Sequence, residues 1–517
     1  MARSSKIRSA LLVAGMAAGL SVRARPARAD GDLNNVGHII VVMMENHSFD
    51  NYFGVLGYVP NSPYHNAPHR RGCDATDHAC VDGLRCKQTT GGLVCKNRNA
   101  NTNAPGVRSF HELRYCIGPD LDHSWDGSHQ EANYRHPERT LRSSKNNGFV
   151  RVNNVANGSD TTQAMNHDTM GYFDDGDIPF YYDLAKTFAI NDRYFCDIIG
   201  QTFPNRAYFM AGTSFGHLTT SEIVGGYKPI TGTIFDRMNA AGVTWASYAS
   251  DIAYSGLMFA AGTGHTKPLS DFTTDANANT LPQVVFVDPS IFEDQAINGS
   301  NYETDEHPPA NIRAGEYFVS TVVNALRNSP SWNDSILFWA YDEHGGYYDH
   351  VPPAPAPQNG ARTPDGIFPG QCADESNPPA SEQPGGGKNC THSRTIDAPG
   401  ICPDFTPTGP YPLDCPAFDQ LGFRVPMAAV SPFSKPHYVS HTVSSHASFL
   451  ALIEKRFSLP SLTIRDANSN DLEDMFDFDN SPSLAAAVST APLPQQPPAQ
   501  NPGDPGCPFS PSAAFLE

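Results

Sequence analysis

A run of seven residues near the amino terminus constrains the fold of this 517-residue chain more than any other feature. Residues His38 to Met44 are apolar after the first position and rich in β-branched side chains, which is typical of a parallel strand buried on both faces. Glu45 and Asn46 follow directly. Because α/β sheets bind ligands in the crevice beyond the carboxyl ends of their strands, these two oxygen donors predict half of a site for a divalent cation. The alternative is that Asn46 caps a helix and Glu45 is solvated.

The same pattern occurs a second time, about three hundred residues later. Residues 335–341 form another apolar run, and Asp342, Glu343 and His344 follow it before two glycines. Taken alone, an adjacent pair of acids is more often part of a solvated turn. Two strand ends with clustered ligands favour a metal or phosphate site at a common edge of the sheet.

Alternating strands and helices predict an α/β fold with a mostly parallel sheet and helices on both faces. Helical spacing of apolar residues is present at 178–189, 316–327 and 446–457. Short apolar or extended stretches at 194–199, 244–248, 284–287 and 427–430 predict further strands. There is no internal repeat, no P-loop and no dinucleotide-binding fingerprint.

The amino terminus resembles a secretion signal. Arg3, Lys6 and Arg8 precede an apolar stretch, and Ala27-Arg28-Ala29 offers a small-x-small cleavage site. The stretch is shorter than the roughly 20 residues of a membrane span. Six of the 35 basic residues lie in this leader, which leaves 29 against 54 acidic residues. Such an acidic chain is a poor binder of nucleic acid and of anionic lipid. We expect a secreted or periplasmic protein with at most peripheral membrane contact.

The cysteines agree with export. Eight of the 11 lie in two polar stretches rich in Gly, Pro and Asn, which predicts disulfides; a zinc cluster is the alternative for the first stretch. The odd total leaves one thiol over, and Cys196, in an apolar run, is the predicted buried free cysteine. The two groups are Cys73, Cys80, Cys86 and Cys95, and Cys372, Cys390, Cys402 and Cys415.

A third segment, residues 197–206, ends an extended stretch and contains Pro204, which suits the first turn of a helix. Thr202 would then lie near a helix amino terminus, where negative charge is favoured. A hydroxyl there could ionise against a cation and attack phosphorus, although an ordinary helix cap explains the segment equally well. His123, His307 and His344 all lie beside acids and could supply phosphate contacts and a proton.

These segments together resemble the bacterial phosphoesterase family that includes phosphatidylcholine-type phospholipases C and a group of acid phosphatases. The matching motifs span about residues 35–460 in the family's order. They are residues 44–54 (Met-Glu-Asn-His-Ser-Phe-Asp-Asn-Tyr-Phe-Gly), 201–206 (Gln-Thr-Phe-Pro-Asn-Arg), 305–309 (Asp-Glu-His-Pro-Pro), 341–350 (Tyr-Asp-Glu-His-Gly-Gly-Tyr-Tyr-Asp-His) and, more weakly, 422–426 with 446–448.

The resemblance implies an alkaline-phosphatase-like three-layer core and hydrolysis of a phosphate ester through a phosphorylated hydroxyl. It implies that Thr202 is the nucleophile and that His123, His307 and His344 contact phosphate or act as acid. It also implies one divalent metal ion, bound by Glu45, Asn46, Thr202, Asp342 and Glu343. Oxygen ligands favour calcium, magnesium or manganese over zinc or iron. The family often has Asp-His-Thr-Ser where residues 445–448 read Ser-His-Ala-Ser, so the role of His446 stays open.

The substrate expected from this resemblance is a phospholipid or another small phosphate ester, cleaved as a phosphodiester. Alternatives are an acid phosphatase acting on monoesters and a non-catalytic secreted binding protein on the same fold. A sulfatase is less favoured, because Thr leads the segment at 202–206 where sulfatases have Cys or Ser. The predicted organisation is a signal peptide at 1–29, one catalytic domain at 30–480 and a Pro/Ala-rich tail at 481–517. Cys-rich insertions are expected at about 58–108 and 353–420, and the oligomeric state is not predicted.

Overall fold

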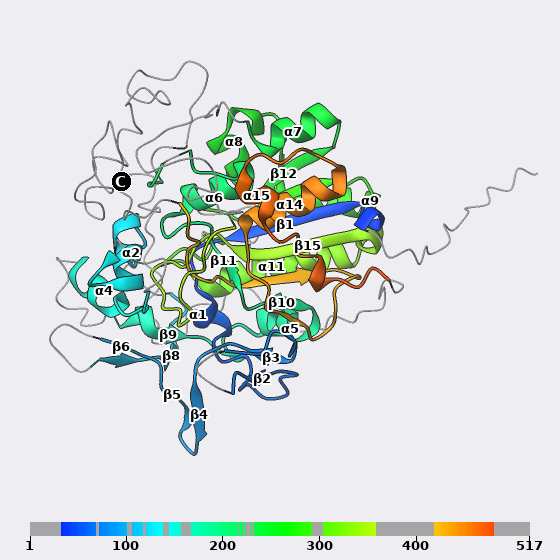
Figure 1. The fold of residues 1–517 in the computed structure, drawn as a ribbon. Coiled ribbons are helices and arrows are strands. Elements are labelled where there is room, and N and C mark those ends of the chain that lie inside the picture. Colours follow the sequence, from blue (N-terminus) through cyan, green and yellow to red (C-terminus); the bar gives the residue numbers. More distant parts are fainter. Residues whose placement is uncertain are drawn as a thin grey trace, which may run out of the picture.

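Strand β1 (His38–Met44) lies inside an eight-stranded sheet in the computed structural model of the chain (Figure 1). Its neighbours β14 (Val284–Asp288) and β15 (Ser335–Tyr341) run parallel to it. Every residue of β1 after His38 is buried, as its apolar sequence requires for a strand covered on both faces. The order across the sheet is β13-β12-β14-β1-β15-β16-β10-β17.

The structure describes most of the catalytic region predicted from the sequence. The predicted signal peptide, most of the second Cys-rich insertion and the tail at 481–517 lie outside the described residues. The residues that the structure describes are 33–68, 72–100, 106–116, 120–137, 144–156, 167–215, 217–220, 223, 229, 232–291, 303–357 and 418–479.

The sheet is mostly parallel, as predicted, and one of its strands runs the other way. On one side of β1, β14 is followed by the parallel strands β12 (Trp245–Ala249) and β13 (Thr266–Pro268). On the other side, β16 (Met427–Val430) is antiparallel to both of its neighbours, β15 and β10 (Ala189–Asn191), and β17 (Val439–Ser440) is parallel to β10. Smaller two-stranded pairs lie outside this sheet: β2 (His65–Asn66) with β3 (Cys80–Val81), β4 (Cys86–Thr89) with β5 (Gly92–Cys95), β6 (Arg98–Asn99) with β7 (Val107–Arg108), β8 (Phe110–His111) with β9 (Gly171–Tyr172), and β11 (Tyr194–Phe195) with β18 (Ser444–Ser445).

Helices cover both faces of the sheet, which confirms the three-layer α/β architecture. Phe338 and Trp339 are adjacent in β15 and therefore point to opposite faces. The Phe338 ring lies 4.9 Å from that of Phe449 in α14 (His446–Phe457), whereas Trp339 stacks on Tyr181 of α5 (Pro179–Thr187) at 4.2 Å. The other helices are α1 (Phe49–Phe53), α2 (Trp125–Asn133), α4 (Phe149–Ala156), α6 (Thr202–Ala211), α7 (Ile234–Ala241), α8 (Tyr254–Met258), α9 (Leu269–Ala278), α11 (Ile312–Arg327) and α15 (Ile464–Asn468).

The predicted helix at 178–189 extends too far, and this is the clearest local error. Helix α5 ends at Thr187 because Phe188 is extended, and residues 189–191 form β10 instead. The helix predicted at 316–327 begins earlier, at Ile312, where the Asn311 side chain accepts a hydrogen bond from the Arg313 N–H and caps the helix.

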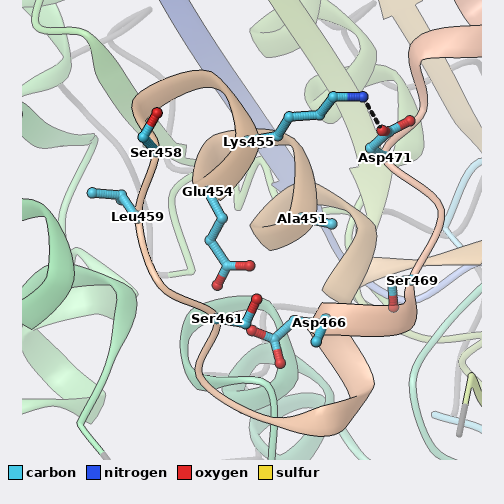
Figure 2. A pocket seen from close by; sticks show the side chains of 10 residues that line it. Ala451, Glu454, Lys455, Ser458, Leu459, Ser461, Asp466, Ser469 and Asp471 are labelled. Atoms are coloured by element: carbon cyan, nitrogen blue, oxygen red, sulfur yellow. Dashed lines mark hydrogen bonds and ion pairs between the residues drawn. The ribbon is translucent and has the colours of Figure 1, made fainter. Parts of the chain in front are cut away.

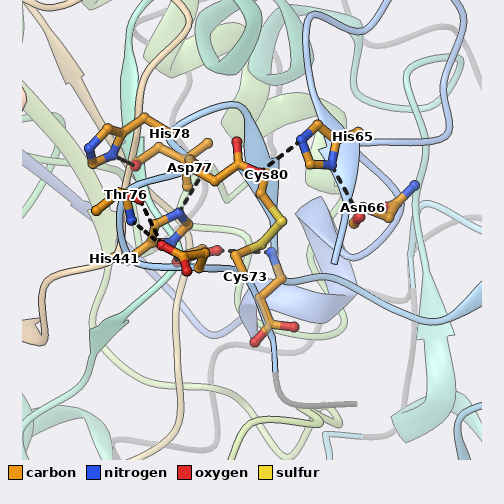
Figure 3. Close-up of a disulfide and its surroundings, with 12 residues drawn as sticks. His65, Asn66, Cys73, Thr76, Asp77, His78, Cys80 and His441 are labelled. Atoms are coloured by element: carbon orange, nitrogen blue, oxygen red, sulfur yellow. Dashed lines mark hydrogen bonds and ion pairs between the residues drawn. A yellow bond between two sulfur atoms is a disulfide. The ribbon is translucent and has the colours of Figure 1, made fainter. Parts of the chain in front are cut away.

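The first Cys-rich insertion is held by disulfides, as predicted. Cys73 pairs with Cys80 and Cys86 with Cys95. Figure 3 shows the first bond, between His65 on one side and the loop of Asp77 and His78 on the other. The second Cys group, at 372–415, lies outside the described residues. Cys196 is a buried free cysteine, which confirms that prediction. None of the described helices is both long and apolar enough to cross a bilayer.

Candidate active site

Three strands bring carboxylates to one edge of the sheet. Met44 pairs with Tyr341 in the register of β1 and β15, so Glu45 and Asp342 are the first residues after the ends of these two paired strands. Asp288 is the last residue of β14, the other neighbour of β1. All three are buried. Burial and the charge of Glu45 raise the pKa of Asp342 well above its usual range, and burial raises the pKa of Asp288 to about 7. Acids crowded at this edge can therefore all be ionised only with a cation beside them.

Arg206, on α6, supplies one such cation. Its Nη2 donates to Glu45 Oε1 at 2.9 Å and its Nε donates to Asp342 Oδ2 at 3.2 Å. The guanidinium carbon lies 3.7 Å from the ring centre of Tyr254, whose hydroxyl also donates to Glu45. Arg206 thus engages one oxygen of each carboxylate and fixes α6 against the ends of β1 and β15.

Thr202 is the first residue of α6, one turn before Arg206. Residues four apart share a helix face, and helical side chains tilt toward the amino terminus, so the Arg206 guanidinium reaches back toward Thr202. The preceding loop is fixed by Asn205, whose Oδ1 accepts from the N–H groups of Asp197 and Ile198 at 2.8 and 3.0 Å. Thr202 therefore lies on the face of α6 that meets the carboxylates.

Asn46 and Glu343 carry polar atoms without hydrogen-bond partners in the part of the chain that the structure describes. These atoms are the amide oxygen and nitrogen of Asn46 and the Oε1 of Glu343, all buried. The other oxygen of Glu343 accepts from the Gly345 N–H at 2.8 Å. Gly345 has a φ of +60°, and a Cβ there would come within 2.1 Å of the Asn46 carbonyl oxygen. Only glycine allows the two segments to approach this closely.

His344 is engaged by carboxylates on both ring nitrogens. Its Nε2 lies 2.8 Å from Glu131 Oε2, and its Nδ1 lies 3.1 Å from Glu343 Oε2. Although burial favours the neutral ring, these two carboxylates raise the pKa of His344 to about 9. The structure thus places His344 between Glu131 and Glu343, and the role expected from the sequence, contact with phosphate or action as an acid, stays a prediction.

His446, whose role the sequence left open, supports Asp342. Its Nε2–H donates to the Asp342 carbonyl oxygen at 2.6 Å, which leaves Nδ1 to accept from the Tyr194 hydroxyl at 2.7 Å. Burial lowers the pKa of His446, in keeping with a neutral ring. The residue fixes the backbone of a candidate ligand from the first turn of α14.

His123 and His307 lie together beside Glu343. Their ring centres are 5.9 Å apart, and His123 Nε2 lies 4.0 Å from Glu343 Oε1. Asp120 lies between them, with carboxylate oxygens 3.7 Å from His123 Nδ1 and 3.8 Å from His307 Nε2. Burial disfavours a charged His123, but Glu343 and Asp120 outweigh it and raise the pKa to about 10. The two predicted histidines thus face the candidate ligands from the loop before α2 and from the loop before α11.

The donor set fits the divalent ion expected from the sequence. A buried oxygen without a partner costs free energy, so the free atoms of Asn46 and Glu343 indicate that something binds them. The carboxylates of Glu45 and Asp342 and the Thr202 hydroxyl would complete a set made of oxygen, which suits calcium, magnesium or manganese. An ion held there would lower the pKa of the hydroxyl and stabilise charge on phosphoryl oxygens.

Sequence reasoning missed several residues of this site. Asp288 had a usable signal, because it ends an apolar strand as Glu45 and Asp342 do. Arg206 lay inside a quoted motif, but spacing alone does not show which distant carboxylates a guanidinium meets. No sequence pattern pointed to Asp120, Glu131 or Tyr254, because only the folding of the chain brings these residues to the site.

A pocket of about 450 Å³ lies elsewhere, between the carboxyl-terminal half of α14 and α15 (Figure 2). Glu454 and Asp466 face each other in it, and Lys455 pairs with Asp471 at its edge. None of the predicted site residues lines this pocket. The predicted site residues lie instead at the edge of the sheet, where His446 begins α14 at the end opposite this pocket.

A sequence model of the Phosphoesterase family matches residues 36–460, a range that includes all the site residues described above. The chain belongs to the phosphoesterase family. It is accordingly a hydrolase that acts on phosphoester bonds.

Named relatives of this phosphoesterase include phospholipases from bacteria and plants. Phospholipase C B of Mycobacterium tuberculosis strain H37Rv is 28% identical over 492 residues, which cover 87% of this chain and 79% of that protein. Non-specific phospholipase C1 of Arabidopsis thaliana is 27% identical over 480 residues, covering 89% and 73%.

Solved structures with a similar arrangement include murine ectonucleotide pyrophosphatase/phosphodiesterase 5, at 12% identity and a TM-score of 0.32, covering 58% of this chain and 94% of that one. A protein of the alkaline phosphatase superfamily from Vibrio parahaemolyticus matches at 11% identity and a TM-score of 0.30, covering 57% and 63%. The α/β architecture itself rests on the sheet described above.

Proposed function

We propose that this protein is a secreted, metal-dependent phosphoesterase of the phospholipase C type, which cleaves phospholipids or related phosphodiesters through a phosphothreonine at Thr202. The substrate class is supported by the similarity to named phospholipases C along 87% of the chain. The mechanism is supported chiefly by one observation: Arg206 fixes the helix that begins at Thr202 against Glu45 and Asp342.

The residues of this chain divide the work as follows. Thr202 Oγ1 attacks phosphorus in line with the leaving alcohol, and its proton passes to solvent or to a nearby carboxylate. His123 and His307 bind the phosphoryl oxygens, and either could protonate the leaving alcohol. Water then attacks the phosphothreonine and restores the hydroxyl. One divalent ion, with calcium, magnesium or manganese favoured, would stabilise the charge that develops on the phosphoryl group.

Secretion is supported by the leader-like amino terminus and by the two disulfides of the first insertion, because such bonds persist in oxidising compartments. A monoester acid phosphatase is the second candidate, since the same threonine and histidines could serve either substrate. The non-catalytic alternative has no observation in its favour once the chain is placed in a hydrolase family.

Two variants test the nucleophile. Thr202→Val keeps the shape of the side chain and removes the hydroxyl, so turnover should fall by several orders of magnitude with an unchanged circular dichroism spectrum. Thr202→Ser keeps a hydroxyl and should retain measurable turnover and form a phosphorylated enzyme on rapid quench. Wild-type rates in Thr202→Val would remove Thr202 from the mechanism. Comparing phosphatidylcholine with p-nitrophenyl phosphate across pH then separates diesterase from monoesterase.

A further inference from the structure

The first Cys-rich insertion contains a strongly positive stretch within an acidic chain. No acidic residue lies between Asp82 and Glu112, although the net charge of the whole chain is −19. All but the first of the basic residues in this interval are exposed. These basic residues are Arg85, Lys87, Lys96, Arg98 and Arg108. We call residues 83–111 the basic segment.

The pairing of β6 with β7 brings two of these cations together. Arg98 is directly opposite Arg108 in the register of this antiparallel pair, so both side chains lie on the same face. Like charges in this position destabilise a strand pair. Arg98 Nε donates to the Gly106 carbonyl oxygen at 3.0 Å, and within the described ranges neither arginine forms an ion pair with an acid. The two guanidinium groups are therefore free to bind an anion outside the chain.

The hairpin of β4 and β5 presents a cation beside an apolar side chain. Lys87 is directly opposite Val94, which is 44% exposed. The Cys86–Cys95 disulfide joins the two strands, and the Cys86 N–H donates to the Tyr58 hydroxyl at 2.9 Å. Figure 1 shows the hairpin projecting from the body of the fold. An exposed cation next to an exposed aliphatic group suits a surface that is anionic outside and apolar beneath.

Hydrogen bonds connect the basic segment to the loop that carries the candidate site. The Asn99 amide donates to the Asn146 carbonyl oxygen at 2.8 Å, and the Asn146 amide donates to the Asp349 carbonyl oxygen at 2.7 Å. Asp349 follows the site residues 342–344 in the loop beyond β15. Lys145, next to Asn146, is a further exposed cation. A surface bound by the basic segment would thus lie beside this loop.

We propose that the basic segment docks the enzyme onto anionic phospholipid surfaces. The negative charge of the whole chain does not prevent this, because salt screens charges more than about 10 Å away at 0.1 M ionic strength. The exposed Val94 beside Lys87 favours lipid over a soluble polyanion, which has no apolar layer to receive an aliphatic side chain. The inference rests on the proposed function, in which the substrate is a phospholipid held in such a surface.

Vesicle sedimentation of the full chain tests the proposal. Vesicles of phosphatidylcholine, with and without phosphatidylglycerol, are mixed with protein in EDTA, which prevents bridging of acidic residues to lipid by divalent ions. The wild type should bind only the phosphatidylglycerol vesicles and dissociate at high salt. Lys87→Gln combined with Arg98→Gln should weaken binding roughly 25-fold, because each cation near an anionic leaflet contributes about fivefold.

A second double variant is the matched control. Lys267→Gln combined with Lys455→Gln changes the net charge equally, but Lys267 lies on β13 and Lys455 on α14, outside the basic segment. This control should bind vesicles as the wild type does. Failure of the wild type to bind phosphatidylglycerol vesicles, or equal weakening in both double variants, overturns the proposal. Retention on heparin without vesicle binding would assign the basic segment to a soluble polyanion and overturn it as well.

Hydrolysis of monomeric dihexanoyl-phosphatidylcholine separates this proposal from the proposed function. The Lys87 and Arg98 double variant should hydrolyse the monomer at the wild-type rate, because no lipid surface takes part. Vesicle binding by a chain that hydrolyses no phosphodiester would refute the proposed function and leave the docking surface in place.

Discussion

Arg206 Nη2 donates to Glu45 Oε1 at 2.9 Å across 161 residues of sequence, and this contact joins α6 to the end of β1. The same guanidinium also holds Asp342. A fixed cation and the proposed metal ion therefore share the same pair of carboxylates, each using part of their oxygens. Stability and metal binding should be coupled through this residue.

Replacing Arg206 by Met tests that coupling. Two buried carboxylates lose their cation, which should cost about 3–5 kcal/mol of unfolding free energy. A divalent ion should recover part of the loss, because it binds the same carboxylates in the folded state alone. Arg465→Met is the matched control: Arg465 is buried, lies over the Tyr208 ring and pairs with Asp197, a carboxylate that is not among the proposed metal ligands. Thermal unfolding with and without Mg²⁺ or Mn²⁺ should show metal rescue only for Arg206→Met; equal rescue in both would refute the coupling.

Glu131 should affect metal affinity although it is not itself a proposed ligand. It holds His344 Nε2 at 2.8 Å and is itself fixed by the Asn153 amide, which donates to Oε1 at 3.0 Å. Glu131→Gln keeps the volume but loses the charge that orients the ring. Removal of such a support typically weakens metal binding 10–100-fold. Glu316→Gln, in a buried glutamate that accepts from the Phe180 N–H, should leave metal affinity unchanged in calorimetric titrations. Wild-type affinity in Glu131→Gln would show that His344 needs no carboxylate to hold Glu343.

Glu306 connects the loop of His307 to α1, to α5 and to the end of β15. Its carboxyl accepts hydrogen bonds from the hydroxyls of Tyr52, Tyr181 and Tyr341, and the next residue is His307. Glu306→Leu would leave three buried hydroxyls without their acceptor, which should cost several kcal/mol and lower kcat by freeing the His307 loop. Glu306→Gln retains one acceptor oxygen and should recover most of both. Loss of stability with an unchanged kcat at low temperature would limit Glu306 to a purely structural role.

The sequence predicted the parts of this molecule in which local pattern and final environment agree. The strand at 335–341 and the helix at 446–457 have the predicted bounds, because a continuous apolar run or a regular 3.6-residue spacing persists to their ends. Ala189 was included in the predicted helix at 178–189 because it continues the apolar spacing of α5, yet residues 189–191 form β10. Pairing with β16 and β17 decides their conformation, and those partners lie more than two hundred residues away.

The candidate site was also only partly predictable from the sequence. Each carboxylate at a strand end could be found from an apolar run followed by acids, whereas the side chains that contact these carboxylates could not. The sequence of β16 also does not predict that this strand is antiparallel, because a short buried run of four apolar residues fits either direction. What pairs Arg206 with Glu45, or Glu131 with His344, is the packing of helices onto the sheet.

A buried network next to the first Cys-rich insertion should set the response of stability to alkaline pH. His350 Nδ1 lies 2.7 Å from Asp50 Oδ2, and its Nε2 lies 3.2 Å from Asp82 Oδ1. Burial lowers the pKa of His350, but the two carboxylates outweigh burial and the nearby Arg424 and raise it from 6.5 to about 9. The same bond helps hold the pKa of Asp82 below its usual range, against the effect of burial.

The pH profile follows from these directions. A histidine with a raised folded pKa stabilises fully below its unfolded value of 6.5, and this stabilisation is lost as pH rises toward 9. Asp82, with a lowered pKa, contributes above its ordinary value of 3.8 and loses that contribution on acidification. Unfolding free energy from urea titrations should therefore fall by on the order of 2 kcal/mol between pH 6.5 and 9 in the wild type. His350→Gln should be less stable at pH 6 and flatter across this range, whereas His129→Gln should keep the wild-type slope there, because burial lowers the pKa of His129 to about 4. A wild-type slope in His350→Gln would mean that another group causes the alkaline loss.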